Sequence, residues 1–278
     1  MKKFVKFLAV GLLAVVGALV LTGCGSEKKA NGPEELKKIG KIRVAVFSDK
    51  IPFGYVDKNG VNRGYDVYFA RRIANDLLGD ENKVEFVLTE AAARTEVLEA
   101  DKVDLVLANF TVTKERAERV DFGLPYMKCM LGVVSKSGII TDVNQLKGKK
   151  LIVNKGTTAE IYFTKKHPEV ELLKYDQNTE AFQALKDGRG VALAHDNTEV
   201  FAWANRNPGY KCGIENLGSL DAIAPAVKKG NKALLDWVNQ EIIALGKENF
   251  FHKAFDAELK VDFGSVSPES VVVEGGKM

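Results

Sequence analysis

The chain contains few cysteines and few histidines, three of each in 278 residues. No Cys-x-x-Cys pair occurs, and His167, His195 and His252 are scattered, so the ligand spacing of a metal site is missing. We therefore expect neither a metal nor a cofactor. Cys129 and Cys212 fall in different predicted elements, and the sequence leaves open whether they pair.

Long apolar runs are also scarce, and the clearest one lies near the N-terminus. Residues 7–21 are largely apolar, follow three lysines and are shorter than the roughly 20 residues that span a membrane. Leu-Thr-Gly then precedes Cys24, which resembles a bacterial lipobox and implies lipid on that cysteine. We expect residues 1–23 to be a lipoprotein signal peptide and residues 24–33 a lipidated tether. The alternative is a plain secretory signal with an incidental cysteine.

An excess of charge of one sign is absent as well. The expected signal peptide carries three lysines and no acid, which leaves 37 basic and 37 acidic residues after it. A formally neutral domain lacks the electrostatic footprint of a nucleic-acid binder, so we expect no nucleic acid as partner.

Strands and helices alternate along the rest of the chain, which indicates an α/β fold with a mixed, mostly parallel sheet flanked by helices. Strands are expected at residues 42–47, 84–88, 103–108, 130–135, 151–154, 171–175 and 191–194. Helices are expected at residues 64–78, 92–100, 155–166, 179–186, 197–205, 232–245 and 248–255. The last residues, 268–278, are expected to be peripheral.

The 255 residues after residue 23 are many for one hydrophobic core and suit two lobes. We expect lobe one to comprise residues 34–132 and 224–278, and lobe two to comprise residues 133–223. The chain then crosses between the lobes twice, near residues 133 and 223, which predicts a hinge.

The segment from Asp104 to Tyr126, DLVLANFTVTKERAERVDFGLPY, carries the most information. A buried strand runs into a polar turn, and Arg116 follows Thr111 by five residues. Thr113 is placed to cap a helix that has Arg116 at its third position. A guanidinium held beside backbone N–H and hydroxyl donors suits one planar carboxylate. Without this context, Arg116 would be interpreted as an exposed helix residue.

This segment resembles the polar amino-acid substrate-binding proteins of ABC importers, the bacterial solute-binding protein family 3. In that family a T-x-T-x-x-R…DF-x-x-PY segment forms the clamp for the α-carboxylate, and the resemblance covers nearly all of the chain after the signal peptide. It implies a two-lobed periplasmic-binding-protein clamshell, a free amino acid as ligand and a membrane permease as partner. We further expect a monomer on the extracytoplasmic side, tethered to a membrane through lipid on Cys24.

A free amino acid presents a carboxylate and an ammonium, so its receptor needs a cation for one and an anion for the other. Arg116 and Thr111 suit the carboxylate. The resemblance assigns the ammonium to Asp196, at the end of a predicted strand of lobe two, and to the backbone carbonyl of Asn109. Asp196 could instead only cap the helix that follows it, since aspartate is a favoured N-cap.

Gly156, Thr157 and Thr158 lie where a predicted strand turns into the N-terminus of a helix. Backbone N–H groups there favour an anion, and glycine lets the backbone approach closely. We expect these residues to complete the carboxylate cage from lobe two, although both threonines could serve only as caps. His195 is expected to be a structural residue behind Asp196.

Three further residues bear on side-chain selectivity. Many family members place an aromatic residue two positions before the proline of the first loop, and here Lys50 stands two positions before Pro52. Arg94 matches an arginine that binders of acidic amino acids use, and its alternative interpretation is an exposed helix residue. Phe110 is expected to help line the cleft.

Across most of its length the chain resembles the cysteine-binding lipoproteins of this family. The stretches that carry this similarity are DKxPFGYVDxxG, LANFT, NKGTTA, LKYDQNTE, HDNT, FFHKA and VVxEGGK, the first of which includes Lys50. The similarity implies L-cysteine as the ligand. Aspartate or glutamate comes second because of Arg94, and another small polar amino acid comes third.

An enzyme on the same scaffold is the alternative from another functional class, since a few such proteins act as dehydratases. Catalysis would need a positioned general acid. Glu90 and Asp49 are the candidates, at the rim of lobe one and without an evident partner. Because Arg116 and Asp196 together suit an intact zwitterion, we expect binding and no catalysis.

Overall fold

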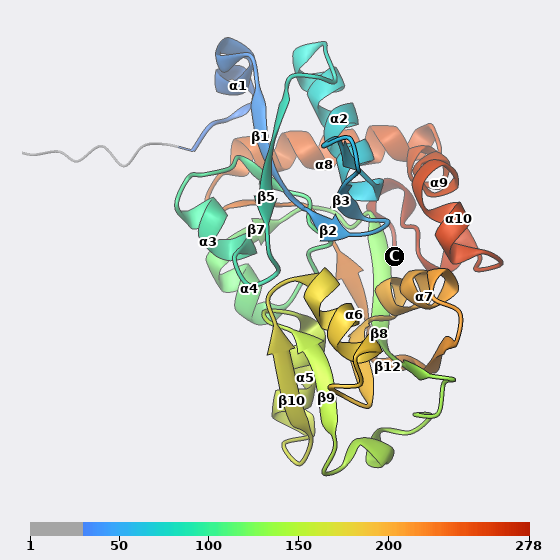
Figure 1. The fold of residues 1–278 in the computed structure, drawn as a ribbon. Coiled ribbons are helices and arrows are strands. Elements are labelled where there is room, and N and C mark those ends of the chain that lie inside the picture. The colour runs from blue at the N-terminus through green and yellow to red at the C-terminus, as the bar shows by residue number, and fades with distance from the viewer. Residues whose placement is uncertain (1–29) are drawn as a thin grey trace, which may run out of the picture.

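The computed structural model describes residues 30–278, which form two lobes joined by two long strands (Figure 1). Lobe one is built on a five-stranded sheet in the order β5-β1-β6-β13-β7. Its strands are β5 (Val84–Thr89), β1 (Ile42–Phe47), β6 (Leu105–Val106), β13 (Ala226–Lys228) and β7 (Val120–Phe122). All of them run in one direction except β13, which is antiparallel to both of its neighbours.

Lobe two is built on a second five-stranded sheet, in the order β10-β9-β11-β8-β12. Its strands are β10 (Glu171–Tyr175), β9 (Lys150–Asn154), β11 (Ala192–Asp196), β8 (Met127–Lys136) and β12 (Tyr210–Ile223). Here β8 is the strand that runs against the others. Each lobe therefore has the mixed, mostly parallel sheet that the alternation of elements predicted.

Helices flank both sheets (Figure 1). In lobe one they are α1 (Pro33–Ile39), α2 (Tyr65–Leu78), α3 (Arg94–Glu99), α4 (Lys114–Arg119), α8 (Lys232–Lys247), α9 (Phe250–Ala254) and α10 (Lys260–Phe263). In lobe two they are α5 (Thr158–Lys166), α6 (Asn178–Lys186) and α7 (Asn197–Arg206). A small antiparallel sheet of β2 (Asp49–Lys50), β3 (Gly54–Val56) and β4 (Asn62–Arg63) extends lobe one. Its strand β2 contacts α6 of lobe two.

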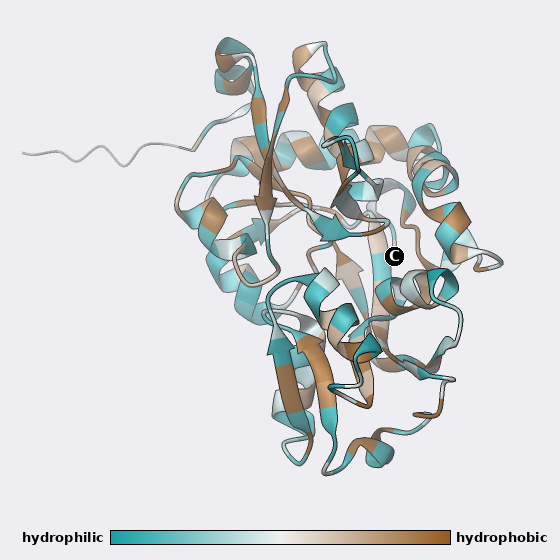
Figure 2. Ribbon diagram, in the orientation of Figure 1, coloured by the Kyte–Doolittle hydropathy of each residue, from teal (hydrophilic) through white to brown (hydrophobic). Residues whose placement is uncertain are grey.

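Helix α2 shows how an apolar stripe positions an element. Val67, Ala70, Ile73 and Leu77 recur on one face, and all four are buried in the core of lobe one. The helix ends at Gly79, whose φ of 76° lies in the left-handed region that glycine enters at little cost. Figure 2 shows apolar residues along strands of the sheets, such as β9, whereas the helices carry both apolar and hydrophilic residues.

The chain passes between the lobes along β8 and β12, which pair with each other. At the lobe-one end, Met127 of β8 forms a bridge with Val272, and from Leu131 onward β8 pairs with β11 of lobe two. The long strand β12 was not expected from the sequence. The boundaries of the lobes at residues 133 and 223 stay a prediction.

The expectation that residues 268–278 are peripheral was wrong. Val271, Val272 and Val273 are buried, and the N–H of Lys128 donates to the carbonyl of Val271 at 2.8 Å. Three consecutive β-branched apolar residues pack beside the start of β8, so burial of apolar surface holds this segment in place.

The two cysteines of the described residues do not pair: Cys129 is buried, Cys212 is half-buried, and both are free thiols. Within residues 30–278, no helix combines the length and the apolar character needed to cross a membrane. The expected signal peptide, Cys24 and most of the expected tether lie outside the described residues.

Candidate functional site

A sharp turn after β6 brings polar groups to the edge of lobe one that faces lobe two. Asn109 has a φ of 46°, and its N–H donates to Oδ2 of Asp66 at 2.8 Å. The hydroxyl of Tyr126 donates to Oδ1 of the same carboxyl at 2.7 Å. Burial raises the pKa of Asp66 to about 6, although both hydrogen bonds oppose the shift. Asp66 thus holds the turn in place, a role that its position in the first turn of α2 could have suggested.

Two arginines of lobe one, Arg94 and Arg116, are buried at this edge. Arg116 donates from Nη1 to the carbonyl of Thr111 at 2.6 Å, and from Nη2 to the carbonyl of Gly156, in lobe two, at 2.7 Å. Arg94 donates from Nη1 to the carbonyl of Asn109 at 3.0 Å, and from Nη2 to the same Gly156 carbonyl at 3.2 Å. The alternative interpretation of these arginines as exposed helix residues is therefore wrong.

The ring of Phe110 contacts both guanidinium groups. Its centroid lies 4.4 Å from Cζ of Arg94 and 4.9 Å from Cζ of Arg116, which are cation–π distances. Burial lowers the pKa of Arg116 to about 10 and holds the pKa of Arg94 well below its ordinary value. Arginine nevertheless keeps its proton in proteins, and in the described chain the hydrogen bonds of both side chains go to backbone carbonyls. Two buried positive charges without a hydrogen-bonded carboxylate favour an anion here.

Lobe two contributes the start of α5. Thr157 is the N-cap of this helix, since its Oγ1 accepts from the N–H of Glu160 at 3.2 Å and donates to the carbonyl of Asn154 at 2.6 Å. Thr158 donates from Oγ1 to Oδ1 of Asp196 at 3.4 Å. Capping is therefore part of what Thr157 does, and contact of either threonine with a ligand stays a prediction.

Gly156 approaches lobe one so closely that no side chain fits. Its φ is 72°, and a Cβ built on it would lie 2.5 Å from Cα of Ala92. Any other residue would force the two backbones apart. This close approach brings the Gly156 carbonyl within reach of both buried guanidinium groups.

Asp196 ends β11 and occupies the N-cap position of α7, but its carboxylate makes no capping hydrogen bond. It faces Lys50 of lobe one instead, with 3.4 Å between Nζ and Oδ2. Lys50 also donates to Oδ1 of Asn109 at 2.7 Å. Burial acts to raise the pKa of Asp196, but nearby positive charge, first that of Lys50, outweighs burial and lowers the pKa below its ordinary value. Asp196 is therefore an ionised carboxylate between the lobes.

His195 is buried beside Asp196 and is neutral. Burial lowers the pKa of its imidazole to about 3. Its Nδ1 accepts a hydrogen bond from the N–H of Asp196 at 2.7 Å, which assigns the proton to Nε2. It thus contacts the backbone of Asp196 and also lines the cavity between the lobes.

This narrow cavity brings together most of the residues predicted from the sequence. The predicted residues that line it are Lys50, Arg94, Asn109, Thr111, Thr157, Thr158 and Asp196. Arg116, Gly156 and Phe110 lie directly beside this lining, in the contacts given above. The lining also contains Phe47 and Ala91, which were not singled out from the sequence. Phe47 is the last residue of β1, so its position at the same edge of the sheet could have indicated that it lines the cavity.

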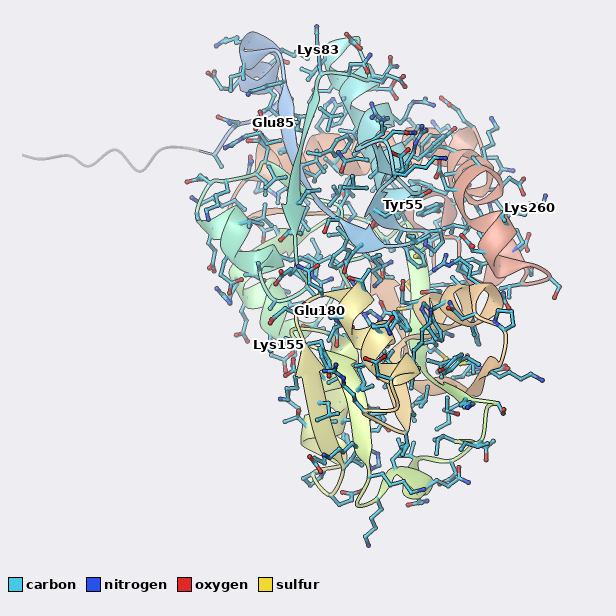
Figure 3. The ribbon with its side chains drawn as sticks, viewed as in Figure 1. Tyr55, Lys83, Glu85, Lys155, Glu180 and Lys260 are labelled. Atoms are coloured by element: carbon cyan, nitrogen blue, oxygen red, sulfur yellow. The ribbon has the colours of Figure 1, made fainter. Side chains whose placement is uncertain are left out.

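Buried charge distinguishes this cavity from the molecular surface. Charged side chains such as Lys83, Glu85 and Lys260 project outward from the ribbon (Figure 3). Lys50 and Asp196, which come from opposite lobes, are in contrast only 1% and 3% exposed. Because charged groups are rarely buried unless they are paired, such a cluster indicates a functional site.

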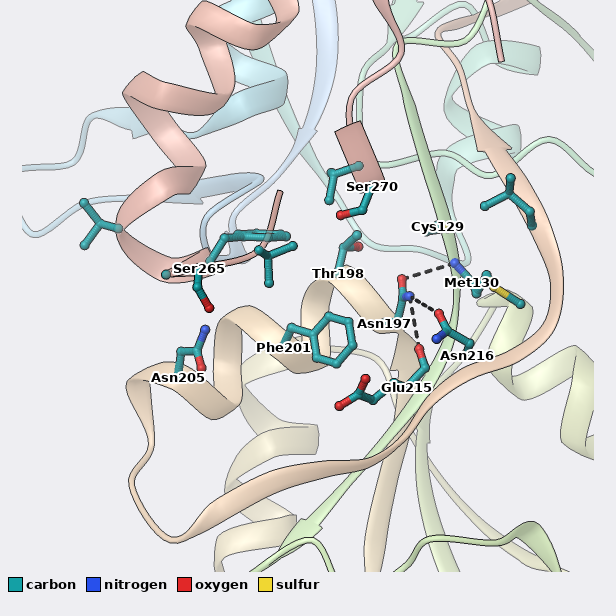
Figure 4. Close-up of a pocket in the computed structure, with 16 residues that line it drawn as sticks. Cys129, Met130, Asn197, Thr198, Phe201, Asn205, Glu215, Asn216, Ser265 and Ser270 are labelled. Carbon is teal, nitrogen blue, oxygen red and sulfur yellow. Dashed lines mark hydrogen bonds between the residues drawn. The ribbon is translucent and has the colours of Figure 1, made fainter. Parts of the chain in front are cut away.

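A larger cavity, of about 670 Å³, lies between α7, the lobe crossing and the C-terminal segment (Figure 4). Asn197 lines this cavity and connects two strands beside it. Its Oδ1 accepts from the N–H of Met130 in β8 at 3.1 Å, and its Nδ2 donates to the carbonyl of Glu215 in β12 at 3.1 Å. Glu215 is the one carboxylate among the described residues that line it, and neither lysine nor arginine is present there. This cavity therefore lacks the opposed charges of the narrow one, which is the better candidate.

Residues 42–257 match the model of the bacterial extracellular solute-binding proteins, family 3. The ABC transporter glutamine-binding protein GlnH of Bacillus subtilis is 32% identical over 271 residues, which cover 92% of this chain and 98% of that protein.

Two solved structures are more similar. The cysteine-binding protein from Campylobacter jejuni is 56% identical, with a TM-score of 0.85 over 87% of this chain and 98% of that chain. The solute receptor for L-cysteine of Neisseria gonorrhoeae is 58% identical, with a TM-score of 0.86 over 88% of this chain and 100% of that chain. The match of the family model over most of the described residues, together with these similarities, shows that the chain belongs to the bacterial extracellular solute-binding proteins of family 3.

Proposed function

We propose that this protein is the extracytoplasmic substrate-binding component of an ABC importer and binds free L-cysteine between its two lobes. The observation that carries this proposal is the pairing of buried charges of opposite sign across one cavity. Arg116 and Arg94 come from lobe one, and Asp196 comes from lobe two. A zwitterion has the matching pair of charges.

The carboxylate of the amino acid would lie against Arg116 and the backbone at Thr111. The guanidinium of Arg116 is a planar donor, and the start of α5 at Thr157 and Thr158 adds N–H and hydroxyl groups from the other lobe. Gly156 makes room for this approach because it has no side chain. The carboxylate would therefore be held from both sides.

The ammonium of the amino acid would lie against Asp196, with the backbone carbonyl of Asn109 as a second acceptor. Asp196 is ionised and has no capping bond to compete for its oxygens. Lys50 lies between these acceptors in the closed arrangement, at 2.7 Å from Oδ1 of Asn109 and 3.4 Å from Asp196. It occupies the place where other family members have an aromatic platform, so it would contact the ligand's side chain.

L-Cysteine is favoured over aspartate or glutamate for two reasons. The two similar structures named above are cysteine-binding proteins, at 56% and 58% identity. In addition, Arg94 is fastened by hydrogen bonds to the carbonyls of Ala91, Asn109 and Gly156 and packs on Phe110. Most of its donors are thus satisfied within the protein, which leaves few for a ligand's second carboxylate.

Hydrogen bonds to the two charged groups of the amino acid are enough to account for micromolar binding. Each hydrogen bond to a charged group contributes roughly 1.5–3 kcal/mol net. A few such bonds, less the cost of immobilising the ligand and the lobes, give about −8 kcal/mol, which is micromolar affinity. Because the ligand contacts both lobes only when they are closed, it stabilises the closed form, which the permease can recognise.

Catalysis is not part of the proposed function. The candidate general acids at the rim of lobe one have partners across the cleft, contrary to the expectation from the sequence. Oε1 of Glu90 accepts from Nε2 of Gln177 at 2.5 Å, and the carboxylate of Asp49 binds the start of α6. Carboxylates held in this way are not free to protonate a substrate.

The place of the protein in the cell envelope follows from the same proposal. Lipid on Cys24 would hold a monomer at the outer side of a membrane, beside its permease. Mass spectrometry of the protein isolated from membranes should find a lipid-modified N-terminal cysteine, and an unmodified N-terminus would refute the anchor.

Calorimetry against all natural amino acids and cystine tests the ligand assignment. We expect L-cysteine to bind most tightly, and Arg116→Ala to lose measurable binding while it still folds, with a cooperative unfolding transition in the absence of ligand. Arg119→Ala is the matched control, because Arg119 belongs to the same helix α4 but pairs at the surface with Glu99, the last residue of α3. Wild-type affinity in Arg116→Ala would refute the carboxylate clamp.

A further inference from the structure

Helix α6 of lobe two begins without a cap of its own. Gln177 occupies its N-cap position, and its side chain makes no capping hydrogen bond. The first N–H groups of a helix have no partner within the helix, so they need an acceptor from elsewhere. Glutamine is not among the residues that commonly provide one.

The acceptor comes from lobe one, about 130 residues earlier in the chain. Oδ2 of Asp49 accepts from the N–H of Thr179 at 3.0 Å and from its hydroxyl at 3.2 Å, and Oδ1 accepts from Nδ2 of Asn178 at 2.9 Å. Thr179 is the second residue of the helix, which is the position whose N–H a regular N-cap side chain binds. Asp49 therefore has the contacts of an N-cap, from the opposite lobe.

Asp49 also adjoins the candidate site. It forms the two-residue strand β2 with Lys50, whose ammonium reaches Asn109 and Asp196 inside the cavity. Strand β2 contacts α6, as Figure 1 shows at the junction of the lobes. The same short strand thus contacts lobe two at the cavity and at the helix N-terminus.

We propose that Asp49 is a closure latch: it caps α6 across the cleft only when the lobes meet, and so prolongs the ligand-bound closed form. This inference rests on the proposed function, because it assumes that closure accompanies binding. When the lobes separate, the carboxylate and the helix N–H groups return to water. The latch therefore stabilises the closed form and leaves the open form unchanged. A negative charge at a helix N-terminus adds to the effect.

Asp49→Ala should weaken L-cysteine binding about fivefold, which is the usual effect of removing an N-cap. The loss should come from faster dissociation, since the latch acts after the lobes meet. Unfolding of the ligand-free protein should be unchanged. Asp142→Ala is the matched control: Asp142 caps a short 3-10 helix inside lobe two, with Oδ1 2.7 Å from the N–H of Asn144. It should lower stability without changing affinity.

A second variant separates capping from other roles of Asp49. Gln177→Ser gives α6 a cap from its own lobe but also removes the bond from Gln177 to Glu90 across the cleft, so affinities are compared within this background. There, Asp49→Ala should cost less than twofold in affinity. An equal loss in both backgrounds would show that Asp49 does not act as a cap. Unchanged affinity and dissociation rate in Asp49→Ala would refute the latch while wild-type binding persists. If the wild-type protein bound no amino acid, the proposed function would fail instead.

Discussion

Replacing Gly156 by alanine should weaken amino-acid binding by holding the lobes apart. The added Cβ would lie 2.5 Å from Cα of Ala92, whereas ordinary van der Waals contact begins at 3.4 Å. The backbones would have to separate by about 0.9 Å. Such a shift moves the Gly156 carbonyl, now 2.7 Å from Nη2 of Arg116 and 3.2 Å from Nη2 of Arg94, out of hydrogen-bond range of both.

The size of the effect follows from the contacts that are lost. Hydrogen bonds to charged groups contribute about 1.5–3 kcal/mol each, so losing two of them destabilises the closed form by at least about 3 kcal/mol. That corresponds to a loss of affinity of ~100-fold or more. In the open form Ala92 is no longer close to residue 156. There the substitution costs only the free energy of placing an alanine at position 156 in the left-handed region, about 1–2 kcal/mol.

Gly148→Ala provides the matched control. Gly148 has a φ of 68°, close to that of Gly156, but no heavy atom lies within 4 Å of a Cβ built there. Both variants should lower the unfolding midpoint of the ligand-free protein by similar amounts, and only Gly156→Ala should lose affinity for L-cysteine in calorimetry. Equal affinity of Gly156→Ala and Gly148→Ala for L-cysteine would show that the closed lobes do not need the close approach of Gly156 to Ala92.

Two further predictions concern buried carboxylates. Asp196→Asn should reduce L-cysteine affinity by about 100-fold in calorimetry, because it removes the charge that faces the ammonium and leaves Lys50 unpaired. Asp176→Asn, which disrupts only an exposed pair with Lys155, should change it less than twofold, and equal effects of the two variants would contradict the assignment. Burial raises the pKa of Glu199 to about 7, above its value in the unfolded chain, and its Oε2 has no partner among the described residues. Folding therefore takes up a proton between about pH 4.5 and 7, so the ionised carboxylate destabilises the fold above pH 7 and the penalty disappears as the pH falls. Glu199→Gln should stabilise the ligand-free protein by up to ~3 kcal/mol at pH 8 and by little at pH 4.5, and equal shifts of the unfolding midpoint at both pH values would be inconsistent with this sign.

Elements whose signals lie within a few residues were predictable. Strand β1 covers residues 42–47 as expected, because its apolar run is buried in the lobe-one sheet. Thr113 caps α4 as expected, with its Oγ1 accepting from the N–H of Arg116 at 3.2 Å. Strand β6 covers only Leu105–Val106, whereas residues 103–108 were expected. After it the chain turns toward the hydrogen bond between Asn109 and Asp66.

The amino-acid sequence by itself predicted Arg116 for the carboxylate of a zwitterion and, through the family resemblance, Asp196 for the ammonium. It placed Arg116 behind a capped turn and Asp196 at the end of an apolar strand, and both patterns are local. Only the tertiary structure decided that Gly156 meets Ala92 and that Asp49 caps α6. Those contacts join different lobes, and no local periodicity encodes them. They exist because each lobe packs around its own hydrophobic clusters, and the two lobes then bring distant segments to the same cleft.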